Sequence, residues 1–275
     1  MMLRVPDTLT IDCAEKYVVS IRLWPGGLSF AGHIPSEKGS FFYTETAFDP
    51  VTPYPQALKD AFFEHVFLSY PYKHVYIICV NRLYTLAPKP VFTEEAEETL
   101  MSFVFSAPGP GYKILHESLP ALEAEMVYGL PEEVYSFCCR SLIRPQFTHA
   151  VTPALLCWRE RNLPCFRKQL YVSVHENIMD AACYDRGALT FLNSFDSGNA
   201  ADLLYYLLYI WKQTGMNQAE DELLLFAPAS LYQELKVTLR KYVNHVVPVE
   251  SPRTTAETDT AHIPLDIISL FGCES

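Results

Sequence analysis

The segment Asp196-Ser197-Gly198-Asn199 is the part of this sequence best suited to binding a charged ligand. It directly precedes a predicted helix, and the backbone N–H groups at a helix N-terminus attract anions. The same four residue types also favour an ordinary helix cap, with Asn199 accepting hydrogen bonds from the first turn. The residues alone therefore leave two interpretations open, an anion site and a structural cap.

Other reactive groupings are absent from the sequence. It has no Gly-x-Ser-x-Gly motif of a hydrolase, and no Cys-x-x-Cys or His-x-x-x-His pair that would suggest metal binding. Cys138-Cys139 and the pair Cys157 and Cys165 lack the spacing of ligands, and the eight histidines are scattered singly. We therefore predict no catalytic residue and no metal ligand, and we expect the cysteines to be reduced and mostly buried.

The elements that would position the Asp196 segment form a compact pattern. Two runs of β-branched and aromatic residues flank the turn His175-Glu176-Asn177 and predict a hairpin. A third strand, a helix that is apolar on almost every side, and a strand buried on both faces follow. We expect the hairpin strands at 170–174 and 178–184, the third strand at 188–193, the helix at 200–214 and the fourth strand at 223–226.

A weaker version of this pattern occurs earlier in the chain, which indicates an internal duplication. In this earlier copy we expect the hairpin strands at 17–23 and 28–34, the third strand at 40–48, the helix at 56–68 and the fourth strand at 75–80. In both copies a helix and a fifth strand are expected to follow, at 93–105 with 112–116 and at 231–243 with 246–249. We predict subdomains at 1–165, with an inserted αβ segment, and at 166–250, followed by a linker and apolar tail at 251–275.

Composition narrows the possible partners. The chain has 275 residues, 49% of them hydrophobic, and a formal net charge of −11 that is shared by both halves. No basic half is available for a nucleic acid backbone, so we expect no nucleic acid partner. No run of 18 apolar residues and no secretory signal is seen, so we expect no membrane span and a cytoplasmic protein.

The order of three meandering strands followed by helix, strand, helix and strand resembles the ribonuclease H-like unit. Two such units in one chain resemble the actin-like ATPase fold, an α/β fold with two mixed sheets flanked by helices. The stretch from Asn193 to Tyr206 is similar to the signature of a family of uncharacterised bacterial proteins with this fold. The turn from Asn81 to Pro88 is similar to one in that family and in actin-like secretion and pilus assembly proteins.

This resemblance implies where a nucleotide would bind. ATP-hydrolysing members place Asp-x-Gly in each hairpin turn, where the glycine admits phosphate and the carboxylate holds Mg²⁺ or its water. The turns here, Trp24-Pro25-Gly26-Gly27 and His175-Glu176-Asn177, contain no aspartate, and Pro25 lacks an N–H group. Asp12-Cys13-Ala14 offers an alternative register, but alanine stands where glycine is needed.

Two functions remain open at this point. The first is a degenerate, non-catalytic actin-like protein that acts as a scaffold or binds an unidentified protein partner. The second is a switch that binds or hydrolyses ATP with Mg²⁺ through Asp196, Gly198 and Asn199. The apolar residues 263–271 of the tail are expected to form a short helix docked on its own domain, with a partner-binding motif as the alternative.

Overall fold

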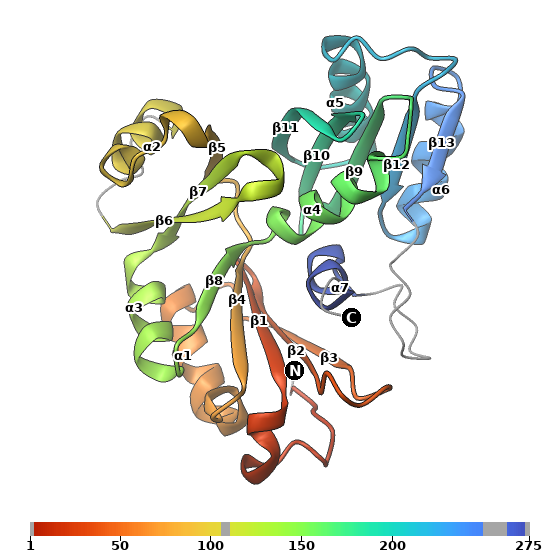
Figure 1. The fold of residues 1–275 in the computed structure, drawn as a ribbon. Helices are drawn as coiled ribbons and strands as arrows, with labels where there is room; N and C mark the ends of the chain where they lie inside the picture. The colour runs from red at the N-terminus through yellow and green to blue at the C-terminus, as the bar shows by residue number, and fades with distance from the viewer. Residues whose placement is uncertain (1–2, 106–110, 250–262, 273–275) are drawn as a thin grey trace. The chain divides into compact units, whose positions relative to one another are not determined.

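The computed structural model describes residues 3–105, 111–249 and 263–272. The chain forms two compact units, one built from residues up to Thr152 and the other from Pro153 onward. Each unit contains a five-stranded mixed sheet with helices packed on it (Figure 1). The predicted α/β class with two mixed sheets is confirmed.

The first unit is centred on a sheet with the strand order β3-β2-β1-β4-β8. Strands β1 to β3 form an antiparallel meander, whereas β4 and β8 run parallel to β1. The central strand β1 is buried along six of its seven residues, because it has neighbours on both sides and cover on both faces. The strands are β1 (Val18–Trp24), β2 (Gly27–His33), β3 (Phe42–Ala47), β4 (His74–Cys79) and β8 (Gln146–His149).

Two helices of the first unit, α1 (Tyr54–Glu64) and α3 (Glu132–Ser141), pack against each other. The rings of Phe62 and Phe137 meet edge to face with their centres 5.0 Å apart. Pro131 directly precedes α3, where a helix start does not need the N–H group that proline lacks. Short 3₁₀ turns connect the elements of this unit at η1 (Ile11–Lys16), η2 (Val66–Ser69), η3 (Lys89–Val91), η4 (Glu94–Ala96) and η5 (Pro120–Leu122).

A third, smaller sheet with the order β5-β7-β6 was not predicted. It consists of β5 (Tyr84–Pro88), β6 (Tyr112–Leu119) and β7 (Ala124–Pro131), and α2 (Glu97–Phe105) packs on it. A strand is present at 112–116, as predicted, but its predicted position as the fifth strand of the main sheet is wrong. These residues belong to β6, which pairs with β7. The fifth strand of the main sheet is β8, which pairs with β4. The turn expected between Asn81 and Pro88 contains β5.

The second unit repeats the arrangement of the first main sheet, with the order β11-β10-β9-β12-β13. Strands β9 to β11 form the meander, and β12 and β13 run parallel to β9. The predicted shared order of elements is thus confirmed, while descent by duplication stays a prediction. The elements are α4 (Val151–Asn162), β9 (Gln169–His175), β10 (Ile178–Asp185), β11 (Ala188–Asp196), α5 (Ala200–Gln213), β12 (Glu222–Phe226), α6 (Ala229–Leu239) and β13 (His245–Pro248).

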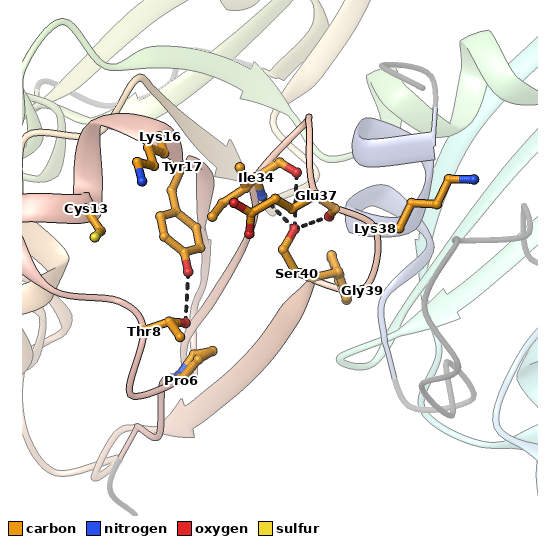
Figure 2. Close-up of a pocket in the computed structure, with 11 residues that line it drawn as sticks. Pro6, Thr8, Cys13, Lys16, Tyr17, Ile34, Glu37, Lys38, Gly39 and Ser40 are labelled. Carbon is orange, nitrogen blue, oxygen red and sulfur yellow. Dashed lines mark hydrogen bonds between the residues drawn. The ribbon is translucent and has the colours of Figure 1, made fainter.

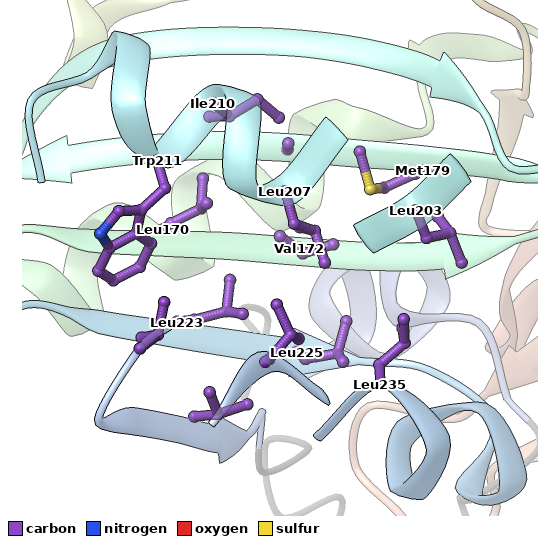
Figure 3. Close-up of a cluster of buried hydrophobic side chains, with 14 of the residues drawn as sticks. Leu170, Val172, Met179, Leu203, Leu207, Ile210, Trp211, Leu223, Leu225 and Leu235 are labelled. Atoms are coloured by element: carbon purple, nitrogen blue, oxygen red, sulfur yellow. The ribbon is translucent and has the colours of Figure 1, made fainter. Parts of the chain in front are cut away.

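Helices cover both faces of this second sheet. On one face, α5 places Leu203, Leu207, Ile210 and Trp211 against side chains such as Val172 (Figure 3). Residues alternate between faces along a strand, so the neighbouring Tyr171 points to the other face, where it stacks on Trp158 of α4 with ring centres 5.5 Å apart. This inner face explains the large aliphatic residues and Trp211 of α5, but not its exposed Tyr205 and Tyr209.

The tail ends in the short helix α7 (Leu265–Gly272), whose Ile267, Ile268 and Phe271 side chains are buried. The expected short helix is therefore present with its apolar side chains buried, and its docking on its own domain stays a prediction. The predicted linker at 250–262 lies outside the described residues. Within the described part of the chain, no helix is both long and apolar enough to cross a membrane.

Candidate functional site

The first hairpin turn lies at the carboxyl end of β1, the edge at which α/β sheets commonly bind ligands. A Cβ atom built on Gly26 would lie 3.3 Å from Nε1 of Trp24, and one built on Gly27 would lie 2.8 Å from Cζ2 of the same indole. The indole therefore lies over both glycines. The Arg22 guanidinium is 5.7 Å from the indole ring centre, within the range of a cation–π interaction. This turn is covered by its own tryptophan.

Packing within the unit accounts for Gly27. A Cβ atom at this position would come within 2.3 Å of the backbone carbonyl oxygen of Thr46 in β3, so only glycine fits. The hydroxyl of Tyr54 donates to the carbonyl oxygen of Gly27 at 3.2 Å. Burial raises the pKa of Tyr54 well above its usual value, which keeps the hydroxyl protonated as a donor. The glycine is required by the fold whether or not a phosphate ever approaches it.

A polar network occupies the carboxyl ends of β4 and β8. The buried His149 donates from Nε2 to the carbonyl oxygen of Asn81 at 3.0 Å, and its Nδ1 accepts from the backbone N–H of Val151 at 3.3 Å. A neutral imidazole with its hydrogen on Nε2 satisfies both bonds. The Asn81 side chain donates to the Gly129 carbonyl oxygen at 3.0 Å and accepts from the Leu83 N–H at 2.8 Å. These groups bond to one another and tie β7 to the main sheet.

Glu117 of β6 places a carboxylate beside the start of α4. Its Oε1 accepts from the His149 backbone N–H at 2.9 Å and the Thr152 hydroxyl at 2.5 Å, and its Oε2 accepts from the Thr148 hydroxyl at 2.8 Å. Burial raises the pKa of Glu117, and the three hydrogen bonds oppose that increase. The donors near this helix start therefore already bond to a carboxyl group of the chain.

The second hairpin turn contains Glu176 and Asn177, which both have positive φ angles of 39° and 63°. Positive φ at both central residues is the geometry of a two-residue hairpin turn. The imidazole of His175 lies between two carboxylates, with Nδ1 2.6 Å from Glu176 Oε2 and Nε2 2.6 Å from Asp180 Oδ2. The hydroxyl of Ser194 donates to the other oxygen of Asp180. Both carboxylates near this turn are thus bonded to side chains of the same unit.

The predicted residues Asp196, Gly198 and Asn199 lie beside this second turn. Asp196 is paired with Ile178 at the end of β11, and the backbone N–H of Ser197 donates to the Asn177 carbonyl oxygen at 2.7 Å. Asn199 is the N-cap of α5, as predicted, and its Oδ1 accepts from the next N–H groups of the helix at 2.9 and 3.0 Å. The structure therefore brings the three residues together, and whether they bind a nucleotide stays a prediction.

The cap also explains the close packing at the start of α5. Asn199 Nδ2 donates to the Asp202 carboxylate at 2.7 Å, and a Cβ atom on Gly198 would lie 3.2 Å from the same carboxylate. Among the residues that the structure describes, no group of three His, Cys, Asp or Glu side chains is arranged to hold a metal ion.

A surface pocket of about 440 Å³ lies elsewhere in the first unit (Figure 2). Thr8 and Tyr17 share a hydroxyl hydrogen bond of 3.1 Å in it, and the Ser40 hydroxyl is bonded to the backbone of Ile34 at 2.8 and 3.1 Å. Cys13 lines the pocket from η1, a 3₁₀ turn ahead of β1. The alternative phosphate register at Asp12-Cys13-Ala14 is therefore wrong, because these residues do not join two strands.

Comparison with known proteins identifies the family. Residues 6–246 match the family described as protein of unknown function, DUF3822. The chain belongs to the DUF3822 family. A crystal structure from Bacteroides thetaiotaomicron, described as a protein with an actin-like ATPase fold and unknown function, is similar with a TM-score of 0.84 and 28% identity, covering 98% of this chain and 100% of that one. The predicted family and actin-like fold are confirmed.

A more distant similarity extends only to the fold of this DUF3822 protein. The structure described as the PilM-PilN type IV pilus biogenesis complex matches with a TM-score of 0.56 and 11% identity, covering 94% of this chain and 97% of that one. No curated protein matches the sequence.

Several features of these sites in the DUF3822 protein were missed by sequence reasoning. Trp24 covers the first turn, and Glu117 bonds to residues that are distant in the sequence. Both arrangements arise from tertiary packing, and no local sequence pattern predicts them. Asp180 did leave a signal, because it is the one acid in the otherwise apolar run 178–184 and lies close to His175 in the sequence. Such a residue requires a polar partner, and the nearby histidine supplies one.

Proposed function

We propose that this protein is a degenerate, non-catalytic member of the actin-like fold that binds another protein instead of turning over a nucleotide. The observation that carries the proposal is the position of Trp24, whose indole lies over Gly26 and Gly27. The backbone of this turn is where a phosphate would need to approach, and Pro25 has already removed one of its N–H groups. A phosphate could reach the turn only if the indole moved away.

The second turn supports the same proposal. A carboxylate that holds Mg²⁺ must present its oxygens to the ion or to the water bound to it. Glu176 and Asp180 instead bond to the two nitrogens of His175, and Asp180 accepts from Ser194 as well. Binding a metal ion here would cost the bonds that hold these three residues together.

The fold can serve in protein assembly, because the similar PilM was solved in a complex with PilN. The partner of this chain is unidentified. Its location in the cytoplasm and the absence of a nucleic acid partner stay predictions.

The alternative is a switch that binds ATP with Mg²⁺ at Asp196, Gly198 and Asn199. Their position beside the second hairpin turn favours it, because a phosphate at the start of α5 would meet helix N–H groups. The Asn199 side chain occupies two of these donors, so the alternative requires the cap to be exchanged for the ligand.

The test is calorimetric titration of the full chain with Mg²⁺-ATP and with ADP, together with thermal unfolding in each nucleotide. A ligand present at 100 times its Kd stabilises the folded state by about 2.7 kcal/mol. For a unit of this size, such stabilisation raises the midpoint by about 5 °C or more. We expect neither heat nor a midpoint shift at about 1 mM nucleotide.

Two variants make the result decisive. Heat and a shift with the unmodified protein would overturn the proposal, and their loss in Asp196→Ala would support the alternative site. Trp24→Gly tests the covering indole directly: binding that appears only in this variant would show that the tryptophan excludes the nucleotide. Fluorescence also reports on the turn, because Trp24 is partly exposed whereas Trp158 and Trp211 are buried.

A further inference from the structure

Four aromatic side chains of the second unit form a continuous row that reaches the surface. The row consists of Phe195 from β11 and Tyr205, Tyr206 and Tyr209 from α5, and we refer to it as the aromatic ladder. The ring centres of Phe195 and Tyr206 are 4.6 Å apart, those of Tyr206 and Tyr205 are 5.5 Å apart, and those of Tyr205 and Tyr209 are 6.2 Å apart. The ladder connects the edge strand of the sheet to the outer face of the helix.

The outer two rings are not needed for the core. The buried residues of α5 on the sheet side are Leu203, Leu207, Ile210 and Trp211 (Figure 3). Tyr205 and Tyr209 lie on the opposite side and are 65% and 48% exposed. Exposed aromatic side chains in contact with one another are typical of binding surfaces, because they contribute a large contact area with little loss of conformational freedom.

The geometry of the exposed pair suits a planar cation. Tyr205 and Tyr209 are one helical turn apart, and their ring planes differ by only 16°. A flat guanidinium group can stack on such a ring, and the negative face of the ring attracts its charge.

The charges around the ladder favour the same ligand. Asp196 ends β11 and Asp202 lies in the first turn of α5, and both residues are exposed. Lys212 lies in the last turn of the helix, so the surface changes from acidic to basic along α5. The chain carries a net charge of −11, which repels the phosphates of a nucleic acid. A cationic group is therefore expected at the acidic end.

We propose that the aromatic ladder docks an arginine-bearing segment of a partner protein, with guanidinium groups stacked on Tyr205 and Tyr209 and directed toward Asp196 and Asp202. This inference rests on the proposed role in protein binding and names the chemistry of the partner segment. Lys212 sets the direction of the segment, because an acidic residue of the partner would lie at that end. A rigid row of rings is already in place, so little ordering is required when the segment binds.

The test uses a defined peptide, acetyl-Gly-Arg-Ala-Arg-Gly-amide, added to the full chain labelled with 3-fluorotyrosine. We expect saturable ¹⁹F shifts at Tyr205 and Tyr209, assigned by substitution. The peptide with citrulline in place of arginine has nearly the same shape without the charge, and we expect it to cause no shift. Binding of the arginine peptide is also expected to weaken as salt is added, because attraction to Asp196 and Asp202 contributes to it.

Matched variants separate the ladder from the rest of the surface. The pair Tyr205→Ser and Tyr209→Ser is expected to weaken peptide binding roughly tenfold or more. Phe63→Ser changes an 87% exposed aromatic residue of the first unit and is expected to leave binding unchanged. Equal thermal midpoints of all three proteins would show that the fold is retained.

Three results would overturn the inference: equal shifts with the citrulline peptide, shifts confined to tyrosines outside the aromatic ladder, or unchanged binding in the double variant. Shifts of Tyr205 and Tyr209 caused by phosphatidylcholine vesicles alone would replace it with a membrane-surface role. The result of the nucleotide titration does not depend on the result of the peptide experiment, so the two proposals are tested separately. Nucleotide binding together with arginine-dependent shifts would overturn the non-catalytic proposal and support the role of the aromatic ladder. Absence of both would support the non-catalytic proposal and overturn the role of the aromatic ladder.

Discussion

Replacement of Glu117 provides a quantitative test of the network that joins the smaller sheet to β8 and to Thr152 within the first unit. In Glu117→Leu, the Thr148 hydroxyl, the His149 N–H and the Thr152 hydroxyl all lose their acceptor. An unsatisfied buried donor costs about 1–3 kcal/mol. The two hydroxyls can rotate to other acceptors but the backbone N–H cannot, so we expect a total loss of about 3 kcal/mol.

Glu117→Gln is the milder variant and isolates the effect of charge. Glutamine keeps one carbonyl oxygen that can still accept from His149 and Thr152, so we expect a loss of about 1 kcal/mol near neutral pH. The charged side chain should also give a distinct pH dependence. Burial raises the pKa of Glu117 in the folded state, so between the usual glutamate pKa and this higher value the folded protein binds more protons than the unfolded one.

The sign of that dependence follows directly. The stability that Glu117 contributes through its raised pKa is fully present below the usual glutamate pKa and is lost as the pH rises through the folded-state pKa. The unmodified protein should therefore lose stability relative to Glu117→Gln as the pH rises across this window. Urea unfolding at a series of pH values measures the difference, and equal slopes of the urea dependence show that the unfolded states are comparable.

Glu98→Gln is the matched control, because Glu98 is an exposed glutamate of the same unit. We expect it to leave stability unchanged within about 0.5 kcal/mol at every pH. A difference between unmodified protein and Glu117→Gln that stays flat with pH, or grows in favour of the unmodified protein as the pH rises, would refute the reasoning about the buried carboxylate. A loss below about 1 kcal/mol in Glu117→Leu would refute the magnitude.

Three further predictions concern stability and are measured by the same urea unfolding. Asn199→Ala removes the cap of α5 and should cost about 1 kcal/mol; an unchanged midpoint would mean that the cap contributes nothing. Gly27→Ala places a Cβ atom 2.3 Å from the Thr46 carbonyl oxygen and should cost about 2–3 kcal/mol, whereas full stability would contradict the close approach of β3. Leu207→Ala removes a fully packed side chain from the core and should cost about 3 kcal/mol; Val237→Ala, at an exposed position, is the control and should change little.

The second unit was well predicted because its strongest signals are local. The strands of the hairpin alternate or are continuously apolar, the turn residues separate them, and the capping residue Asn199 marks the start of α5. Each of these signals lies within about 15 residues of the element that it specifies, which is the range over which periodicity can be read.

The smaller sheet was missed because β5 was interpreted as a turn and the strand predicted at 112–116 was assigned to the main sheet. Only two residues of β5 are buried, and β6 carries lysine, histidine and glutamate among its apolar residues. The assignment of β5 as a strand depends on its pairing with β7, in which Tyr84 lies opposite Tyr128. A half-polar strand and a half-polar loop look alike until the partner strand is known.

The candidate site was only partly predictable for the same reason. Asp196, Gly198 and Asn199 are neighbours in sequence, so their proximity was evident. The bonds of Glu117 instead connect positions 31, 32 and 35 residues apart, and the indole of Trp24 covers its turn through a side-chain orientation that sequence does not specify. The sequence shows that both turns lack aspartate. It does not show that the Trp24 indole covers the first turn or that His175 bonds to the carboxylates near the second.

The insertion of the smaller sheet between β4 and β8 has a consequence for the order of folding. The parallel pair Tyr76 and Gln146 closes a loop of 70 residues, whereas the corresponding pair Glu222 and His245 in the second unit closes only 23. A loop about three times longer costs about 1 kcal/mol more to close in a flexible chain. If β5 to β7 assemble first, they shorten the effective loop and remove much of that cost. We therefore expect β8 to join its sheet last, after the smaller sheet has formed, and the second unit to complete its sheet sooner.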